Sequence, residues 1–191
     1  MRVLLNNKRY HPLFKGTDLE GQTPFHLACK SKHEELITIL VTMGKDVIDW
    51  NAKNHNGETG FHYACAQTTA ELAVIPRLLD VEETKLDVNL CDNDGWTGFH
   101  WLCLYGCLTS INHLLALEEG RLDINSRTKR GWTGFDIACF KGHLTVINRL
   151  LEVANILNID VARGLTEAQH WGHYEIVSSI QQYKAKKEIH Q

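Results

Sequence analysis

The nine residues Gly95–Cys103, GWTGFHWLC, decide the fold, because three other stretches of the chain repeat their pattern position by position. These stretches are GQTPFHLAC at 21–29, GETGFHYAC at 57–65 and GWTGFDIAC at 131–139, so the spacings are 36, 38 and 36 residues. Two landmark pairs at helical spacing follow each copy, for example Leu36-Ile37 and Leu40-Val41, and all but Ser110-Ile111 are fully apolar. Such a period indicates an array of stacked structural repeats.

Each repeat is predicted to contain a tight turn followed by two helices. The turns are marked by Asn56-Gly57, Asp94-Gly95 and Arg130-Gly131, since these glycines suit the positive φ of a hairpin turn. A threonine two places after each glycine is suited to capping the first helix. One such unit cannot bury its own apolar stripe, so it must be stabilised by stacking on its neighbours.

These units resemble the ankyrin repeat, whose TPLH signature is echoed by Thr23-Pro24-Phe25-His26 and by TGFH at Thr59 and Thr97. The Gly-His pair of that family is found at Gly142-His143 and Gly172-His173. The resemblance covers roughly residues 18–180. It implies an all-α repeat solenoid of helix–turn–helix units joined by β-hairpin-like loops, forming a single elongated domain.

The repeat register predicts the domain organisation. The predicted parts are a partial N-terminal repeat or cap at 1–20, repeats at 21–56, 57–94, 95–130 and 131–160, a degenerate capping repeat at 161–183, and a polar tail at 184–191.

The repeats also depart from the family pattern. Glycine replaces the family proline in three of the four repeats, and Asp136 replaces the histidine of the fourth. Three extra residues precede the landmark Asn51, Asn89 and Asn125 of the following unit, which predicts either a second helix longer by one turn or a longer loop. Two further residues fall near Gln67–Glu71.

Composition narrows the location and the partners. The chain has 20 basic and 23 acidic residues, a net charge of −3, which gives no field that would attract nucleic acid or an anionic membrane. No apolar run approaches the ~18 residues of a membrane span, and the N-terminus does not read as a signal peptide. We therefore expect an intracellular protein, cytoplasmic with the nucleus left open, whose cysteines are reduced.

Cysteine and histidine recur together and invite a chemical interpretation. Cys29, Cys65, Cys103 and Cys139 share one repeat position, three residues after His26, His62 and His100 in the first three units. Equivalent residues of stacked helices lie about 10 Å apart, too far to share one zinc ion. We therefore predict buried cysteines, no metal, no cofactor and no catalytic residues. The resemblance implies that the histidines hydrogen-bond backbone between adjacent repeats.

Asn51, Asn89 and Asn125 occupy the hairpin asparagine position of the family. One interpretation is structural, in which each side chain bonds hairpin backbone. The other is asparaginyl hydroxylation, because LEEGRLDIN at 117–125 resembles the substrate sequence preferred in the family, and LDVN ending at Asn89 matches it less well.

The resemblance implies that a partner binds at the hairpin tips and on the first helices of the repeats. By register, the predicted partner-binding residues are His55, Glu58, Trp96, Leu104, Tyr105, Lys129, Arg130, Trp132, Phe140 and Lys141. Aromatic residues concentrate in the third and fourth repeats, and such residues dominate binding hot spots. For Trp96 and Trp132 a structural role between neighbouring hairpins is left open.

These observations favour a non-enzymatic, monomeric scaffold or adaptor that binds another protein and no small-molecule substrate. Two alternatives are kept open. In the first alternative, the repeats are the targeting module of a larger enzyme, of a secreted effector or of a ubiquitin-ligase substrate receptor. In the second, the Cys/His positions form the site of a thiol or metal enzyme.

Overall fold

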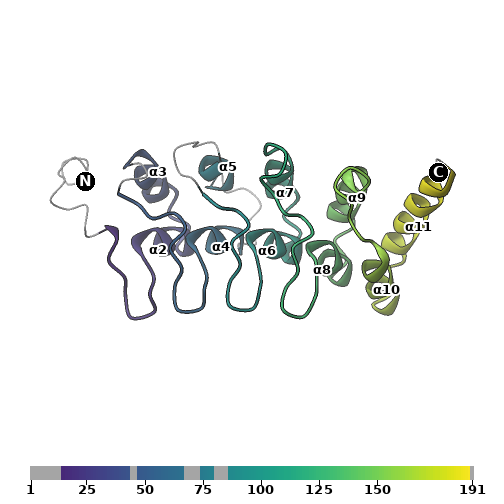
Figure 1. The fold of residues 1–191 in the computed structure, drawn as a ribbon, viewed down its shortest axis with the longest axis horizontal. Helices are drawn as coiled ribbons and strands as arrows, with labels where there is room; N and C mark the ends of the chain where they lie inside the picture. Colours follow the sequence, from purple (N-terminus) through teal and green to yellow (C-terminus); the bar gives the residue numbers. More distant parts are fainter. Residues whose placement is uncertain (1–13, 44–46, 67–73, 80–85, 190–191) are drawn as a thin grey trace. The chain divides into compact units, whose positions relative to one another are not determined.

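The structure is a computed structural model that describes residues 14–43, 47–66, 74–79 and 86–189 (Figure 1). Contacts divide the chain into two compact units, Met1–Gly98 and Phe99–Gln191. Within the described residues every regular element is a helix, and one isolated antiparallel bridge joins Cys91 to Thr97. None of the described helices is long and apolar enough to cross a membrane. The predicted all-α repeat class is confirmed.

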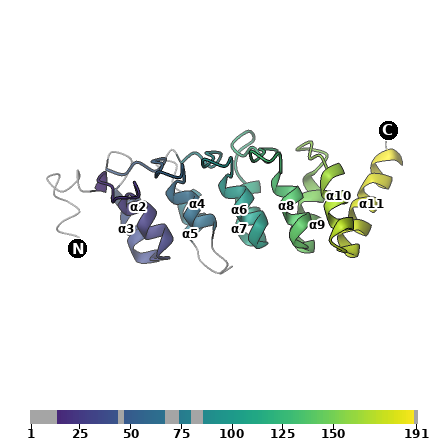
Figure 2. The same cartoon turned by 90° about the horizontal axis from the view of Figure 1, so that it is seen from below.

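The described residues of the first unit form two pairs of helices. Its inner helices are α2, Pro24–Lys30, and α4, Gly60–Cys65, and its outer helices are α3, Glu34–Met43, and α5, Val74–Leu79. α2 packs against α4 and α3 packs against α5, and each inner helix is paired with the outer helix that follows it (Figure 2). The buried side chains between these layers include Phe25, Ile37, Leu40, Phe61 and Leu78.

The second unit repeats this arrangement with three pairs of helices. They are α6, Gly98–Tyr105, which begins at the last residue of the first unit, with α7, Leu108–Leu115; α8, Gly134–Lys141, with α9, Leu144–Val153; and α10, Ala162–His170, with α11, Tyr174–Ile189. α8 packs on α9 and α10, and α11 packs on the same two helices.

A threonine and a histidine together cap the N-terminus of an inner helix. The Thr23 hydroxyl accepts a hydrogen bond from the His26 N–H at 3.4 Å, and His26 Nδ1 accepts one from the Thr23 N–H at 3.1 Å. The other ring nitrogen, Nε2, donates to the Glu58 carbonyl of the next repeat at 3.0 Å. The same hydrogen bond between repeats joins His62 Nε2 to the Trp96 carbonyl at 2.9 Å and His100 Nε2 to the Trp132 carbonyl at 3.2 Å. The predicted role of these histidines is confirmed.

A tight turn precedes each of these inner helices, as predicted. In the first unit the Asn54 N–H donates to the Glu58 carbonyl and the Gly57 N–H donates to the Asn54 carbonyl, both at 2.9 Å. Gly57 has a φ of +76°, a left-handed conformation that side chains rarely adopt. The hairpins lie on the side of the inner helices away from the outer helices (Figure 1).

The glycine found in place of the family proline has a packing role. A Cβ built on Gly60 would lie 2.4 Å from the Phe25 ring, and one built on Gly98 would lie 2.5 Å from the Phe61 ring. The second unit repeats this contact between Gly134 and Phe99 and between Gly164 and Phe135. α4, α6 and α8 must therefore begin without a side chain, because the phenylalanine of the preceding repeat occupies that space. In α10 the same glycine is the third residue.

The extra residues of the long repeats form a loop in the third repeat. α7 ends at Leu115, and residues 116–121 form turns and bends. Of the two predicted alternatives, the longer loop is therefore observed here. The corresponding segments of the first two repeats lie mainly outside the described residues, as do Glu82 and Glu83. The two further residues predicted near Gln67–Glu71, before α5, also lie outside them.

The two ends differ in what the structure describes. α11 continues to Ile189, so residues 184–189 of the predicted polar tail extend the capping helix. Lys186 and Lys187 lie in its last turn, where cations stabilise the negative end of the helix dipole. Residues 1–13 of the predicted N-terminal repeat lie outside the described residues. The repeat boundaries and the single uninterrupted domain stay predictions.

Candidate partner-binding surface

Three aromatic side chains of the second unit meet on one surface. Trp132 follows a hairpin turn, Phe140 lies in the last turn of α8, and Trp171 is the C-cap of α10. The Phe140 ring makes edge-to-face contacts with both tryptophans, at centroid distances of 5.6 Å to Trp132 and 5.1 Å to Trp171. Trp171 is 53% exposed, and the other two side chains are half-buried. We call Trp132, Phe140 and Trp171 the aromatic surface.

Backbone hydrogen bonds hold these residues in place. The Phe140 carbonyl accepts a hydrogen bond from His173 Nε2 at 3.1 Å. The Thr128 N–H donates to the Trp132 carbonyl at 2.9 Å, and the Trp132 N–H donates to the Thr128 hydroxyl at 3.2 Å. The aromatic surface is therefore positioned by the repeat framework rather than by unsupported loops.

Cationic side chains lie over two of the rings. The Arg163 guanidinium is 4.6 Å from the Trp132 ring centroid, and its Nη1 donates to the Gly131 carbonyl at 3.0 Å. Lys141 Nζ lies 5.0 Å from the Phe140 ring centroid. Attraction between a cation and an aromatic ring stabilises such pairs. The two cations therefore place positive charge beside the rings.

Sequence reasoning predicted Trp132, Phe140 and Lys141 but missed Trp171 and Arg163. Both missed residues belong to residues 161–183, which the repeat register predicts to be a degenerate cap. Aligning Gly172-His173 with Gly142-His143 places Trp171 at the repeat position of Lys141. That alignment is the signal that could have identified Trp171 as part of a fifth inner helix.

Two other predicted residues lie at the end of α6. Tyr105 is 37% exposed and stacks on Trp101, with ring centroids 6.1 Å apart. Leu104 is half-buried, and its carbonyl accepts a hydrogen bond from His143 Nε2 at 2.9 Å. Among the described residues no ring contact joins Tyr105 to the aromatic surface, so the structure does not unite these predicted residues through such contacts.

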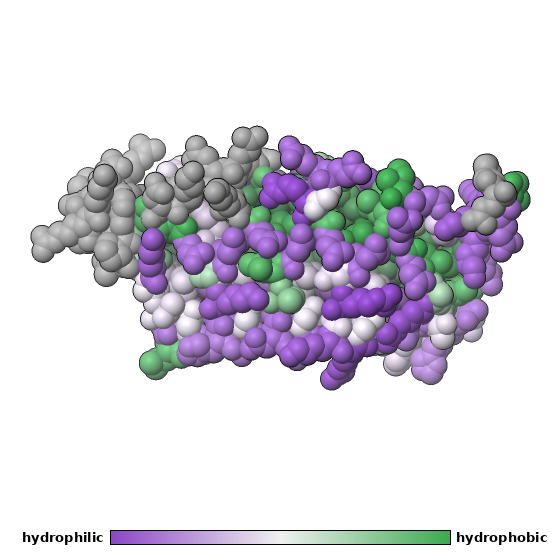
Figure 3. Space-filling model, viewed as in Figure 1, coloured by the Kyte–Doolittle hydropathy of each residue, from purple (hydrophilic) through white to green (hydrophobic). Residues whose placement is uncertain are grey.

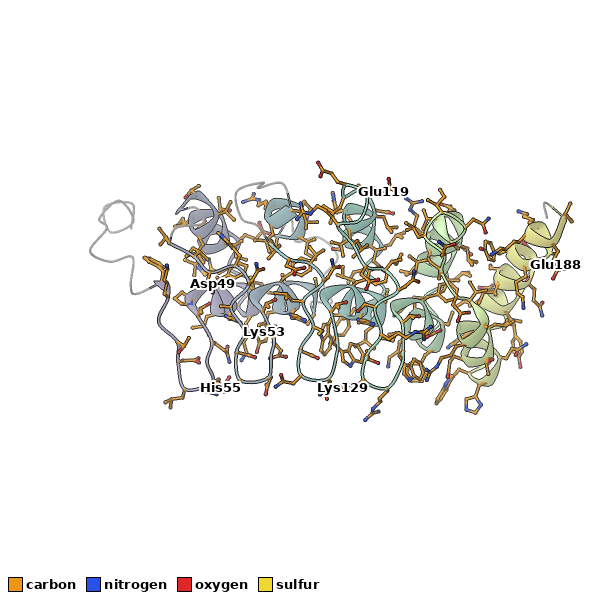
Figure 4. The ribbon with its side chains drawn as sticks, in the orientation of Figure 1. Asp49, Lys53, His55, Glu119, Lys129 and Glu188 are labelled. Carbon is orange, nitrogen blue, oxygen red and sulfur yellow. The ribbon has the colours of Figure 1, made fainter. Side chains whose placement is uncertain are left out.

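The predicted hairpin-tip residues are exposed. Lys129 lies at the tip of the hairpin before α8, and His55 lies at the tip of the hairpin before α4 (Figure 4). Arg130 is the exposed neighbour of Lys129. Hydrophilic side chains predominate along the hairpins on the face that Figure 3 shows.

His55, Glu58 and Trp96 belong to the first unit, and their role in binding stays a prediction. The Glu58 carboxylate accepts hydrogen bonds from the Tyr63 hydroxyl at 2.8 Å and from Asn54 Nδ2 at 2.9 Å. Burial opposes ionisation of Glu58, but these hydrogen bonds outweigh it and hold the pKa of Glu58 below its ordinary value. Trp96 is half-buried, and its backbone N–H is bonded within its own hairpin.

The landmark asparagines connect neighbouring repeats. Asn125 is exposed, and its Nδ2 donates to the Leu157 carbonyl at 2.9 Å. Asn51 Oδ1 accepts a hydrogen bond from the Asp87 N–H at 2.9 Å. These side chains bond backbone, as the structural interpretation holds, although the backbone belongs to the following repeat. Hydroxylation of Asn125 and Asn89 stays a prediction, which the mass of the corresponding peptides from the native protein would test.

The four cysteines that share a repeat position are buried. Burial raises the pKa of Cys103 well above its ordinary value, and it also raises the pKa of Cys29 and Cys139. A thiolate, which is the form that attacks substrates and binds metals, is therefore disfavoured there. In the part of the chain that the structure describes, no three potential metal-ligating side chains gather at one point.

Asp136 is a buried carboxylate with an incomplete set of partners. Its Oδ2 accepts a hydrogen bond from the Thr133 N–H at 3.0 Å, whereas its Oδ1 has no partner among the described residues. Burial raises the pKa of Asp136 above its ordinary value of 3.8. Ionised Asp136 is therefore a source of instability in the second unit.

The variant Asp136→Asn should raise the free energy of unfolding at pH 7 by about 1 kcal/mol, because the amide stays neutral. Since the folded pKa of Asp136 is raised, its stabilising contribution is fully present below pH 3.8 and is lost as the pH rises through the folded pKa. The advantage of Asn should therefore shrink as the pH falls toward 3.8. Urea unfolding across this pH range tests the prediction, with the exposed Glu119→Gln as control. A gain that does not change with pH would contradict it.

Models of known protein families match two overlapping parts of the chain. A model described as ankyrin repeats (many copies) matches residues 25–75, and one described as ankyrin repeats (3 copies) matches residues 69–162. No curated protein matches the chain.

Proposed function

The chain belongs to the ankyrin-repeat family, whose members are generally protein-interaction modules and typically not enzymes, and we propose that it is an adaptor that holds a partner protein on its aromatic surface. The observation that carries this proposal is the edge-to-face cluster of Trp132, Phe140 and Trp171 at the surface of the second unit. Tryptophan is among the residue types that dominate binding hot spots, because a large rigid ring excludes water over a wide area at little entropic cost.

The supporting contacts suit a binding surface. Phe140 is fixed between two tryptophans, so its ring is already ordered before a partner arrives. Trp171 is the most exposed of the three, and its free ring area is available to a partner. Preorganised side chains lose little freedom on association, which favours affinity.

Affinity capture from the native source tests the proposal. We expect Trp171→Ala and Phe140→Ala each to weaken capture of the partner at least tenfold (roughly 1.4 kcal/mol or more). Trp171→Ala should change the melting temperature little, whereas Phe140→Ala should lower the free energy of unfolding by about 1 kcal/mol because its ring is half-buried. The control is Ile156→Ala, which removes an exposed apolar side chain elsewhere in the same unit.

The proposal is wrong if both aromatic variants capture the same proteins as the unmodified chain in the same amounts. Tyr105→Ala, measured in parallel, shows whether the binding surface extends to α6.

A further inference from the structure

Three cations close in sequence to Trp132 or Phe140 have no acidic partner among the described residues. Lys141 lies next to Phe140 in sequence and over its ring, and Lys129 and Arg130 form the exposed tip of the hairpin that leads to Trp132. Among the described residues no carboxylate lies within ion-pair distance of these three side chains.

Three acidic side chains of the same region are engaged or buried, whereas Glu175 at the start of α11 is exposed. Asp160 pairs with Arg127 at 3.8 Å, and Glu167 pairs with Arg163 at 4.0 Å. Asp136 is buried beneath the surface. The three unpaired cations outnumber Glu175, so the net charge around the aromatic surface is positive, although the chain as a whole carries −3.

This excess of positive charge is not a feature of every repeat. In the first unit Lys30, at the repeat position next to that of Lys141, pairs with Glu20 at 3.8 Å. Glu58, at the repeat position of Trp132, adds a negative charge there, since its pKa is held low. The positive surroundings thus coincide with the aromatic side chains of the second unit.

We propose that the partner presents an acidic segment, whose carboxylates face Lys129, Arg130 and Lys141 and whose apolar side chain packs on Trp171. This inference rests on the proposed function and adds the chemistry of the partner to it. Complementary charge speeds association and selects among partners more than it adds affinity. Single-stranded RNA would also suit rings and cations, but binding to nucleic acid depends on a strong positive field, which three cations on a chain of net charge −3 do not supply.

Selection of random short peptides displayed on phage against the full chain tests the inference. We expect the enriched peptides to combine aspartate or glutamate with an aromatic or large aliphatic residue. The most enriched peptide, synthesised with a fluorophore, should lose affinity about tenfold in Lys129→Glu/Lys141→Glu and should bind more weakly as salt is added. The matched control is Lys184→Glu/Lys187→Glu on α11, which makes the same change in charge and should leave the Kd within about twofold.

The outcomes separate the two proposals. If the enriched peptides need Trp171 and Phe140 but are neutral or basic and bind Lys129→Glu/Lys141→Glu normally, the acidic partner is wrong and the adaptor proposal stands. If no peptide is enriched, or if the enriched peptides bind Trp171→Ala and Phe140→Ala as well as the unmodified chain, both proposals fail. Tighter binding of a single-stranded RNA oligonucleotide than of the peptide would overturn the proposal that the partner presents an acidic protein segment.

Discussion

Gly134→Val should lower the free energy of unfolding of the second unit by about 3 kcal/mol. A Cβ on Gly134 would lie 2.4 Å from Phe99 Cε1 and 2.9 Å from Cys103 Sγ. Phe99 is 1% exposed and Cys103 is fully buried, so neither side chain can move aside without disturbing the packing around it. Urea unfolding followed by circular dichroism measures the loss.

A second substitution separates this steric effect from the helix propensity of valine. Phe99→Leu removes the ring atoms that the new side chain would meet. The double variant Gly134→Val/Phe99→Leu should therefore be more stable than the sum of the two single losses indicates, by about 1 kcal/mol or more. Simple additivity, or a Gly134→Val protein as stable as the original, would show that close approach of the phenylalanine does not require glycine.

His100→Leu should cost about 3 kcal/mol of unfolding free energy and should also weaken partner binding. His100 is fully buried, and its Nε2 lies 3.0 Å from the Ser126 carbonyl and 3.2 Å from the Trp132 carbonyl. Carbonyl oxygens only accept, so this nitrogen is the donor to both. Leucine keeps the volume of the side chain but leaves the backbone of the hairpin without this donor.

The effect on binding follows from the position of that hairpin, which carries Lys129, Arg130 and Trp132. Thermal unfolding and the affinity for a captured partner should change together in His100→Leu. The control His113→Leu alters an exposed histidine on α7 and should stay within about 0.5 kcal/mol of the original stability. Unchanged stability in His100→Leu would contradict the anchoring role of the histidine.

Much of the local structure could be predicted because each repeat contains the capping, turn and hydrogen-bonding residues that specify it. Threonine caps such as Thr23, hairpin glycines such as Gly57 and the histidine bonds between repeats all depend on residues in fixed register. The choice between a longer helix and a longer loop after α7 could not be predicted, because both place the next hairpin in register. The helix over residues 184–189 could not be predicted, because polar residues such as Lys184 are equally suited to an exposed helix and to an irregular tail.

The sequence alone determined the repeat class, the helix pairs, the hairpin turns and the burial of the four cysteines that share a repeat position, since these follow from local periodicity and turn chemistry. Only the tertiary structure decided which aromatic residues lie in contact with one another. Trp132, Phe140 and Trp171 come from a hairpin, from the end of α8 and from the end of α10, and their rings meet because α8 packs directly on α10. It also showed why glycine begins α4, α6 and α8, because the ring that excludes a side chain there belongs to the preceding repeat.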